Sequence, residues 1–144
     1  MDRPGIPSYA GFWKRFAAAI VDWVITYIGG FVIGFLIGFG YGLQGGSSEE
    51  AEIVGFIIGA LLGWIYYAAM ESSLKQATLG KIILGIKVTD LGGHRISFSK
   101  ASGRFWGKIV SLLTVGIGFL MIGFTEKKQG LHDLMSGCLV VNKH

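Results

Sequence analysis

Two long apolar segments dominate the pattern of hydrophobic and polar positions along the chain. Residues 16–43 contain a single charged residue, Asp22, and residues 53–70 contain none. A run of about 18 or more apolar residues can form a helix that crosses the roughly 30 Å hydrocarbon layer of a bilayer. Aromatic and basic residues at positions 12–15 are typical of a membrane interface. We therefore expect one transmembrane helix over residues 12–43 and a second over residues 53–70.

A third apolar segment, residues 104–124, allows two arrangements. Its uncharged part, residues 109–124, is 16 residues long and is interrupted by glycines, which is short for a span. If the segment crosses the membrane, the C-terminus lies outside. If it re-enters or bends steeply near residues 115–118, both of its ends stay on one side, and the basic residues on both flanks favour this arrangement. We therefore expect a third short helical segment that is re-entrant or bent.

The polar parts of the chain show a different periodicity. Residues 81–99 combine two β-rich stretches with a turn-forming Asp-Leu-Gly-Gly-His sequence at residues 90–94, which predicts a β-hairpin. An isolated hairpin is marginally stable in water, so it needs a further strand or a packing surface. Residues 138–142, within an expected cytoplasmic tail over residues 125–144, are a suitable third strand.

The distribution of charge predicts the orientation of these elements. The turn between the two spans carries three acids and no lysine or arginine, whereas residues 71–108 carry seven basic residues. The positive-inside rule then places the N-terminus and the hairpin in the cytoplasm of a multi-pass protein of the cell (inner) membrane. The net charge of +4 is explained by this orientation, so we expect no nucleic-acid partner. Lys81 and Lys87 are expected to anchor the hairpin near anionic lipid.

Composition supports this fold class. The chain of 144 residues is 51% hydrophobic and only 15% charged, which suits a single bilayer domain better than a soluble one. We expect a membrane all-α fold with two transmembrane helices, a third short segment and a small cytoplasmic β-hairpin. A cleavable signal peptide is disfavoured, because the first apolar run is too long and contains Asp22. The sequence carries no recognisable nucleophile, metal or cofactor motif, so we expect neither enzymatic activity nor a cofactor.

Charged residues at the inner ends of the spans are the candidate site. Arg15 and Asp22 are seven residues apart, close to two helical turns, and so share one helix face. A charge inside lipid is costly, so Asp22 needs a partner or a function. In the expected topology Glu71, His132 and Asp133 lie near the same membrane surface. These five residues are our candidates for an ion or proton site.

The same cluster has a functional and a structural interpretation. Burial raises the pKa of a carboxyl group and a nearby arginine lowers it, so the two effects together could poise Asp22 for proton or cation exchange. His132 could relay a proton at physiological pH. Alternatively, the charges form an internal network that holds the helices and the tail together, and removing one partner would leave a buried unpaired charge.

Glycines recur at intervals of four residues along both spans. Rows of small residues at this spacing let helix backbones approach closely in lipid, so we expect them to serve helix packing and contacts in a homo-oligomer. The six positions are Gly30, Gly34, Gly38, Gly55, Gly59 and Gly63.

Several segments, in this order, resemble the RDD family of small bacterial and archaeal membrane proteins. The matching segments are Arg15 with Asp22, Gln76 to Lys81, Gly85 to Asp90, Arg104, residues 118–130 and Leu131 to Asp133. Gly137-Cys138 departs from the family pattern, in which a small residue and a threonine stand there. The resemblance implies a small integral membrane protein, and it suggests transport because some members are linked to sodium–proton antiport.

Two functions from different classes follow. The first is a small transporter that exchanges a monovalent cation for a proton. Because two and a half spans cannot readily enclose a pathway, this function predicts a homo-oligomer. The second is a non-catalytic membrane module that binds a protein partner or lipid through its cytoplasmic hairpin, with the charge cluster serving structure. Both predict the lipid bilayer as the surrounding medium.

Overall fold

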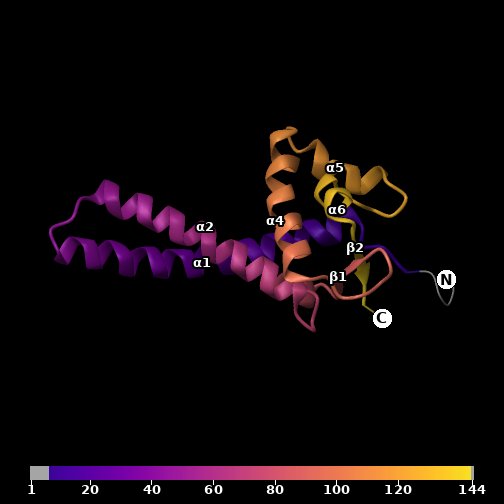
Figure 1. Cartoon of the computed structure of the whole chain (residues 1–144), viewed down its shortest axis with the longest axis horizontal. Coiled ribbons are helices and arrows are strands. Elements are labelled where there is room, and N and C mark those ends of the chain that lie inside the picture. Colours follow the sequence, from indigo (N-terminus) through magenta and orange to yellow (C-terminus); the bar gives the residue numbers. More distant parts are fainter. Residues whose placement is uncertain (1–6, 144) are drawn as a thin grey trace.

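The computed structural model describes residues 7–143, and two long antiparallel helices project from one end of it (Figure 1). Helix α1 covers Phe12–Leu43 and helix α2 covers Ser48–Ser72. A capping box starts α2, because the Ser47 hydroxyl accepts from the Glu50 amide at 3.2 Å and the Glu50 carboxylate accepts from the Ser47 amide at 3.4 Å. The second helix therefore begins five residues before the predicted start at residue 53.

Both helices are long and apolar enough to cross a membrane, and their apolar side chains point outwards. Phe31 on α1 is 68% exposed and Phe56 on α2 is 78% exposed. Large exposed apolar surfaces of this kind are unfavourable in water and favourable in contact with lipid. The two predicted membrane helices are confirmed as candidate spans.

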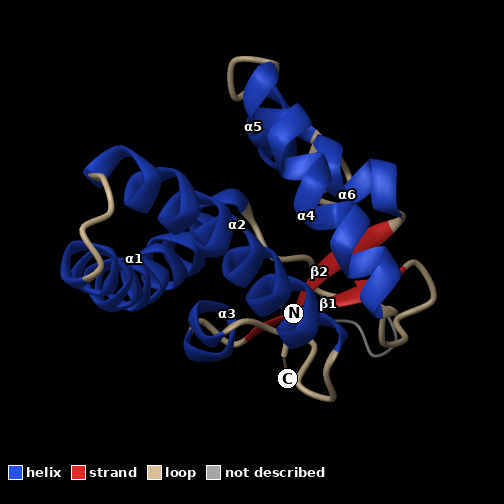
Figure 2. Cartoon of the chain, turned by 60° about the vertical axis from the view of Figure 1, so that its left-hand side comes forward, coloured by secondary structure: helices blue, strands red, loops and turns tan. Residues whose placement is uncertain are grey.

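A two-stranded antiparallel sheet lies at the other end of the molecule (Figure 2). Strand β1 (Ile86–Asp90) pairs with strand β2 (Cys138–Asn142), in a register that places Val88 opposite Val140. The segment before α1 joins the free edge of β2, because the Ala10 amide donates to the Val140 carbonyl at 2.9 Å. One face of the sheet packs on a small core of Ile86, Val88, Cys138, Val140, Ile96 and the alanines at positions 10, 18, 68 and 101.

This sheet corrects the predicted hairpin over residues 81–99. Its first strand is present as β1, but residues 79–83 form the short helix α3 (Leu79–Ile83). Residues 95–99 form no strand, because the Ser97 side chain accepts from the Lys100 amide at 3.1 Å and caps the next helix. The partner of β1 is instead the C-terminal strand β2, whose position at residues 138–142 was predicted correctly.

The third apolar segment forms two helices with a steep bend. Helix α4 (Phe98–Leu113) and helix α5 (Ile117–Phe124) meet at 103°. Val115 and Gly116, between them, both have left-handed backbone conformations, with φ of 56° and 79°. The predicted bend near residues 115–118 is confirmed, although the helical segment starts at residue 98 rather than 104. In Figure 1, α4 runs across the direction of α1 and α2 rather than beside them.

A last short helix, α6 (Leu131–Ser136), packs against α4 and leads directly into β2. Gly118 in α5 lies so close to α4 that a Cβ added to it would come within 2.8 Å of the Ser111 Cα atom. The turns around α5 and α6 therefore fold back onto α4 and return the chain to the sheet.

Candidate functional site

A series of buried ion pairs connects five helices where the α1–α2 hairpin meets the sheet. Arg15 comes from α1, Glu71 from α2, Lys81 from α3, Arg104 from α4 and Asp133 from α6. None of the five is more than 8% exposed. We call these five residues the charge network. It contains three of the five residues predicted for the site, together with two that were not in that set.

Arg104 occupies the centre of the charge network. Its Nε atom donates to the Asp133 Oδ1 atom at 2.8 Å, and its Nη1 atom is 2.7 Å from both carboxylate oxygens of Glu71. One guanidinium therefore bridges an acid from α2 and an acid from α6. The planar arrangement of its donors suits this bridging, which the single ammonium group of a lysine could not reproduce.

Arg15 connects the start of α1 to the end of the chain. Its Nη1 atom pairs with Asp133, its Nε atom donates to the Ala10 carbonyl at 3.1 Å, and its Nη2 atom donates to the Lys128 carbonyl at 2.5 Å. All three contacts involve segments outside the membrane helices. The prediction that Asp133 approaches Arg15 is confirmed.

Lys81 forms a buried ion pair with Glu71 and is only 7% exposed. Burial lowers the pKa of Lys81, and the neighbouring Glu71 opposes that shift. The interpretation of Lys81 as an anchor for anionic lipid was therefore wrong. The reason is that α3, which the sequence pattern did not reveal, turns this side chain inwards towards α2.

Asp133 serves both the charge network and its own helix. Besides its two arginines, the carboxylate accepts from the Gly130 amide at 3.1 Å, which caps the start of α6. Burial alone would raise the pKa of Asp133, but Arg104 and Arg15 outweigh burial and hold that pKa well below its ordinary value. Asp133 is therefore a permanent anion at physiological pH.

Asp22 stands apart from the charge network. It is 1% exposed, and its carboxylate accepts from three neutral donors: Tyr66 Oη at 3.0 Å, Thr78 Oγ1 at 2.5 Å and the Gly80 amide at 2.8 Å. No lysine or arginine within residues 7–143 forms an ion pair with it. Asp22 therefore holds α3 against α1 and α2, and the expected grouping of Asp22 with Arg15 is replaced by this separate cluster.

The polar groups of both clusters are fully used in the described part of the chain. Every buried side-chain nitrogen and oxygen there has a hydrogen-bond partner. No group of three or more His, Cys, Asp or Glu side chains among residues 7–143 is arranged to hold a metal ion. This arrangement suits a network of contacts that holds the helices together.

Comparison with known proteins identifies the family. The model of the RDD family matches residues 9–137, which is nearly the whole chain. The chain belongs to the RDD family. It is 36% identical to the uncharacterized protein YxaI of Bacillus subtilis (strain 168), over 93% of this chain and 97% of that protein. It is 27% identical to the uncharacterized membrane protein YteJ of the same organism, over 94% of this chain and 82% of that protein. No solved structure matches the chain significantly.

The RDD motifs of the sequence map onto both clusters. Arg15 and Asp133 lie in the charge network, whereas Asp22 lies in the separate cluster. The segment Gln76–Lys81 contributes to each, through Thr78 and Gly80 to Asp22 and through Lys81 to Glu71. The family pattern thus marks the contacts between α3 and the two spans.

His132 is buried beside the charge network of this RDD family member. Its Nδ1 atom lies 3.2 Å from the Ser111 Oγ atom, and its Nε2 atom lies 3.5 Å from Asp133 Oδ1. Burial is the main reason that the pKa of His132 falls to about 3, although Asp133 opposes that shift. His132 is therefore neutral at physiological pH, which does not favour the proton-relay interpretation.

Five residues of the two clusters were not in the predicted set: Tyr66, Thr78, Gly80, Lys81 and Arg104. Arg104 was named in the family pattern, but no contact was predicted for it. Gly80 could not have been found from charge, because it acts by its small size. A Cβ at this position would lie 2.2 Å from the Ala18 carbonyl oxygen of α1. The only signal in the sequence was the family motif that spans Gln76–Lys81.

The glycine rows make no close contacts within the chain. A Cβ added at Gly34 or Gly59 would meet no atom within 4 Å, and the same holds at the other four predicted positions. These glycines therefore do not bring α1 and α2 of one chain together. Their predicted role in contacts between chains stays a prediction.

Proposed function

We propose that this RDD family protein is a non-catalytic membrane module. In this proposal the α1–α2 hairpin anchors the protein, and the charge network fixes a cytoplasmic part that binds a partner molecule. This part, which we call the inner subdomain, comprises residues 73–97 and 125–143. The observation that carries the proposal is that every acid of the charge network is already paired with a buried arginine or lysine. Such acids hold segments together and have no free oxygen to offer a transported ion.

The distribution of charge supports a cytoplasmic location for the inner subdomain. Glu49, Glu50 and Glu52 lie at the start of α2, and residues 44–52 contain no lysine or arginine. The basic residues gather at the other end of the hairpin. This arrangement matches the positive-inside rule for a protein of the cell (inner) membrane. The N-terminus belongs to the same side, because residues 8–10 hydrogen-bond to β2.

The pairing of the two strands supports a re-entrant or surface location for α4 and α5. Strand β1 precedes these helices and strand β2 follows them, and the two strands are hydrogen-bonded neighbours. A single crossing between them would put the strands on opposite sides of the bilayer. In this proposal the segment over residues 98–124 leaves the membrane on the side where it enters.

A transport assay separates this module from the first candidate function. The wild-type protein is reconstituted into vesicles that contain a pH-sensitive dye, and a sodium or potassium gradient is applied. We expect no cation-driven proton flux from folded protein. Flux that Asp22→Asn abolishes while the protein stays folded, and that Glu52→Gln at the start of α2 leaves intact, would overturn the proposal.

Cation–proton exchange keeps one specific observation in its favour. Asp22 is a buried carboxylate within a candidate span, and its partners are two hydroxyls and an amide rather than a cation. A carboxylate of this kind can exchange a proton for a cation if water reaches it. Two helices cannot enclose a pathway, so exchange would require a homo-oligomer. Cross-linking in the membrane that yields only monomer would remove this candidate.

A further inference from the structure

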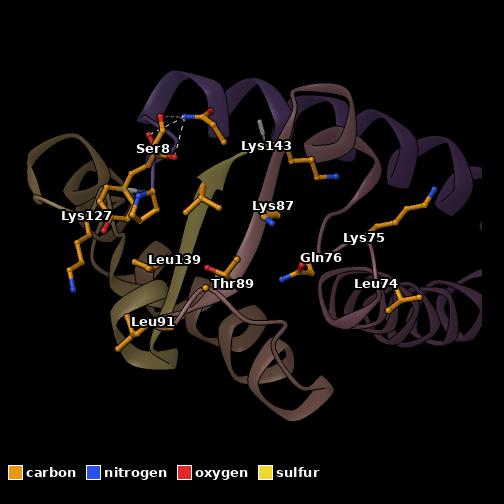
Figure 3. A pocket seen from close by; sticks show the side chains of 16 residues that line it. Ser8, Leu74, Lys75, Gln76, Lys87, Thr89, Leu91, Lys127, Leu139 and Lys143 are labelled. Atoms are coloured by element: carbon orange, nitrogen blue, oxygen red, sulfur yellow. Dashed lines mark hydrogen bonds between the residues drawn. The ribbon is translucent and has the colours of Figure 1, made fainter. Parts of the chain in front are cut away.

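Outside both clusters, one face of the sheet forms the floor of a groove (Figure 3). Its volume is about 840 Å³, within the range of small-molecule sites. Thr89 of β1 and Leu139 and Val141 of β2 form the floor, which is the side of the sheet opposite the core. The segment at residues 7–9 closes one side and the loop at residues 74–76 closes the other.

The groove is strongly basic. Four of its 16 lining residues are lysines, and none is an aspartate or glutamate. The lysines come from four separate places: Lys75 after α2, Lys87 on β1, Lys127 before α6 and Lys143 after β2. Segments far apart in the sequence therefore contribute positive charge to one surface. In Figure 3, Lys87 and Lys143 lie on the sheet, while Lys75 and Lys127 lie towards opposite ends of the groove.

These lysines differ from the bases of the charge network. Arg15, Lys81 and Arg104 are each paired with a buried acid. In the part of the chain that the structure describes, no ion pair or hydrogen bond involves the ammonium group of any of the four groove lysines. Their ammonium groups are therefore available to a ligand.

Most of the other polar side chains of the groove already have hydrogen-bond partners. The side-chain amide of Gln76 donates to the Val88 carbonyl at 3.1 Å. The side-chain amide of Asn142 accepts from Lys14 Nζ at 2.7 Å and donates to Ser8 Oγ at 2.9 Å. A ligand of this groove is therefore recognised mainly by the ammonium groups. Because ammonium groups act as compact point charges, they suit phosphate oxygens well.

We propose that the groove binds a phosphate-bearing anion, either the headgroup of an anionic phospholipid or a soluble phosphorylated molecule. This rests on the proposed function, because it names the chemistry that the inner subdomain recognises. Leu74 at the rim is 87% exposed and follows the end of α2 by two residues, so an apolar rim meets the surface of the bilayer beside Lys75. That placement brings lipid phosphates within reach of the groove, and soluble phosphates reach it from the cytoplasm.

Lysine footprinting tests the site residue by residue. The full chain is placed in nanodiscs of phosphatidylcholine, and labelling by an amine-reactive reagent is followed for each lysine by mass spectrometry. One arm replaces a third of the lipid by phosphatidylglycerol, and the other adds inorganic pyrophosphate. We expect labelling of Lys75, Lys87 and Lys143 to slow several-fold in at least one arm, while Lys100 on α4, outside the groove, is unaffected.

The arm in which protection occurs identifies the source of the phosphate. Protection with phosphatidylglycerol indicates a lipid headgroup, and protection with pyrophosphate indicates a soluble ligand. The triple variant of Lys75, Lys87 and Lys143 to Gln should weaken binding by about fivefold for each lysine removed, whereas Lys100→Gln should not weaken it. No protection in either arm, or equal protection of Lys100, would overturn this inference. Neither result says whether the protein carries out cation-driven proton flux, so the vesicle assay tests the proposed function independently.

Discussion

At the scale of single residues, buried ion pairs join helices of this protein in addition to its small hydrophobic core. Arg104 joins acids from α2 and α6. Because it is only 2% exposed, water cannot take the place of these acids as its partner. Removing one partner of a buried ion pair destabilises a protein more than replacing both partners by apolar residues, because one buried charge is left unpaired.

Arg104→Met should therefore destabilise the protein by about 3–5 kcal/mol, because Glu71 and Asp133 lose their shared partner. The free energy of unfolding can be measured by titration with denaturing detergent, followed by circular dichroism. Arg95→Met is the matched control, since Arg95 is exposed and the same charge is removed. Equal losses in the two variants would contradict the role of the charge network.

Gly80→Ala should also destabilise the protein, for steric reasons. The added methyl group would lie 2.2 Å from the Ala18 carbonyl oxygen, which belongs to the backbone of α1 and cannot move aside cheaply. Gly103→Ala in α4 is the control, because its methyl group would meet nothing within 4 Å and alanine favours a helix. We expect opposite signs for the two changes in thermal unfolding temperature.

Acid should destabilise the fold through His132. The folded protein keeps this imidazole neutral down to about pH 3, whereas the unfolded chain binds a proton near its ordinary pKa of 6.5. Stability is therefore lost as pH falls below 6.5, by about 2 kcal/mol at pH 5. Asp133, whose pKa is lowered from 3.8, adds a further loss in the same direction below that value.

Unfolding midpoints at pH 7.5, 6 and 5 check this prediction. His132→Gln should reduce the difference between pH 7.5 and pH 5, because the titrating group is gone while a polar side chain remains near Ser111. If the variant loses as much stability as the wild type over this range, another group is responsible for the acid sensitivity.

At the scale of elements, the sequence predicted the two helices that have long apolar patterns. The two apolar runs are each long enough to be a candidate membrane span, so α1 and α2 could be located from hydropathy alone. Strand β1 was also predicted, but the pairing partner was not, since a β-rich stretch at residues 95–99 looked like the nearer choice. The hydroxyl of Ser97 capped a helix there instead. A cap depends on one hydrogen bond, which alternation of apolar residues does not reveal.

The short helix α3 explains what could not be predicted about the site. Five residues are too few to show helical periodicity, yet α3 directs Lys81 to Glu71 and the Gly80 amide to Asp22. The acids were found from the sequence because a charge near an apolar run is conspicuous. Their partners depend on the turn taken after α2, and only the tertiary structure fixes it.

The bend between α4 and α5 has a local cause that can be tested. Gly116 has a φ of 79°, a conformation that costs other residues roughly 1–2 kcal/mol. Gly116→Ala should therefore lower the unfolding free energy by about 1 kcal/mol or more. Gly123→Ala in α5, where φ is helical and a Cβ has free space, provides the comparison. An unchanged stability for Gly116→Ala would mean that the bend does not require the left-handed conformation.

At the scale of the whole molecule, the arrangement predicts that both chain ends lie on one side of the membrane. The Asn142 backbone amide donates to the Ser8 carbonyl at 2.8 Å. These two parts of the chain therefore cannot be separated by a bilayer. Epitope tags at the N-terminus and after His144 should both resist protease in right-side-out vesicles. A tag within residues 44–47 should be cleaved. Cleavage of the C-terminal tag alone would refute the proposed path of α4 and α5.

The pairing of Arg15 with Asp133 also has a consequence for how the protein is made. The two residues are 118 positions apart in the sequence. During synthesis, the first helix is inserted into the membrane long before its ionic partner exists. The arginine can be neutralised only after α6, which carries Asp133, has been synthesised. A truncated product would keep an unpaired charge at the membrane surface, and quality-control proteases could recognise the incomplete protein by this charge.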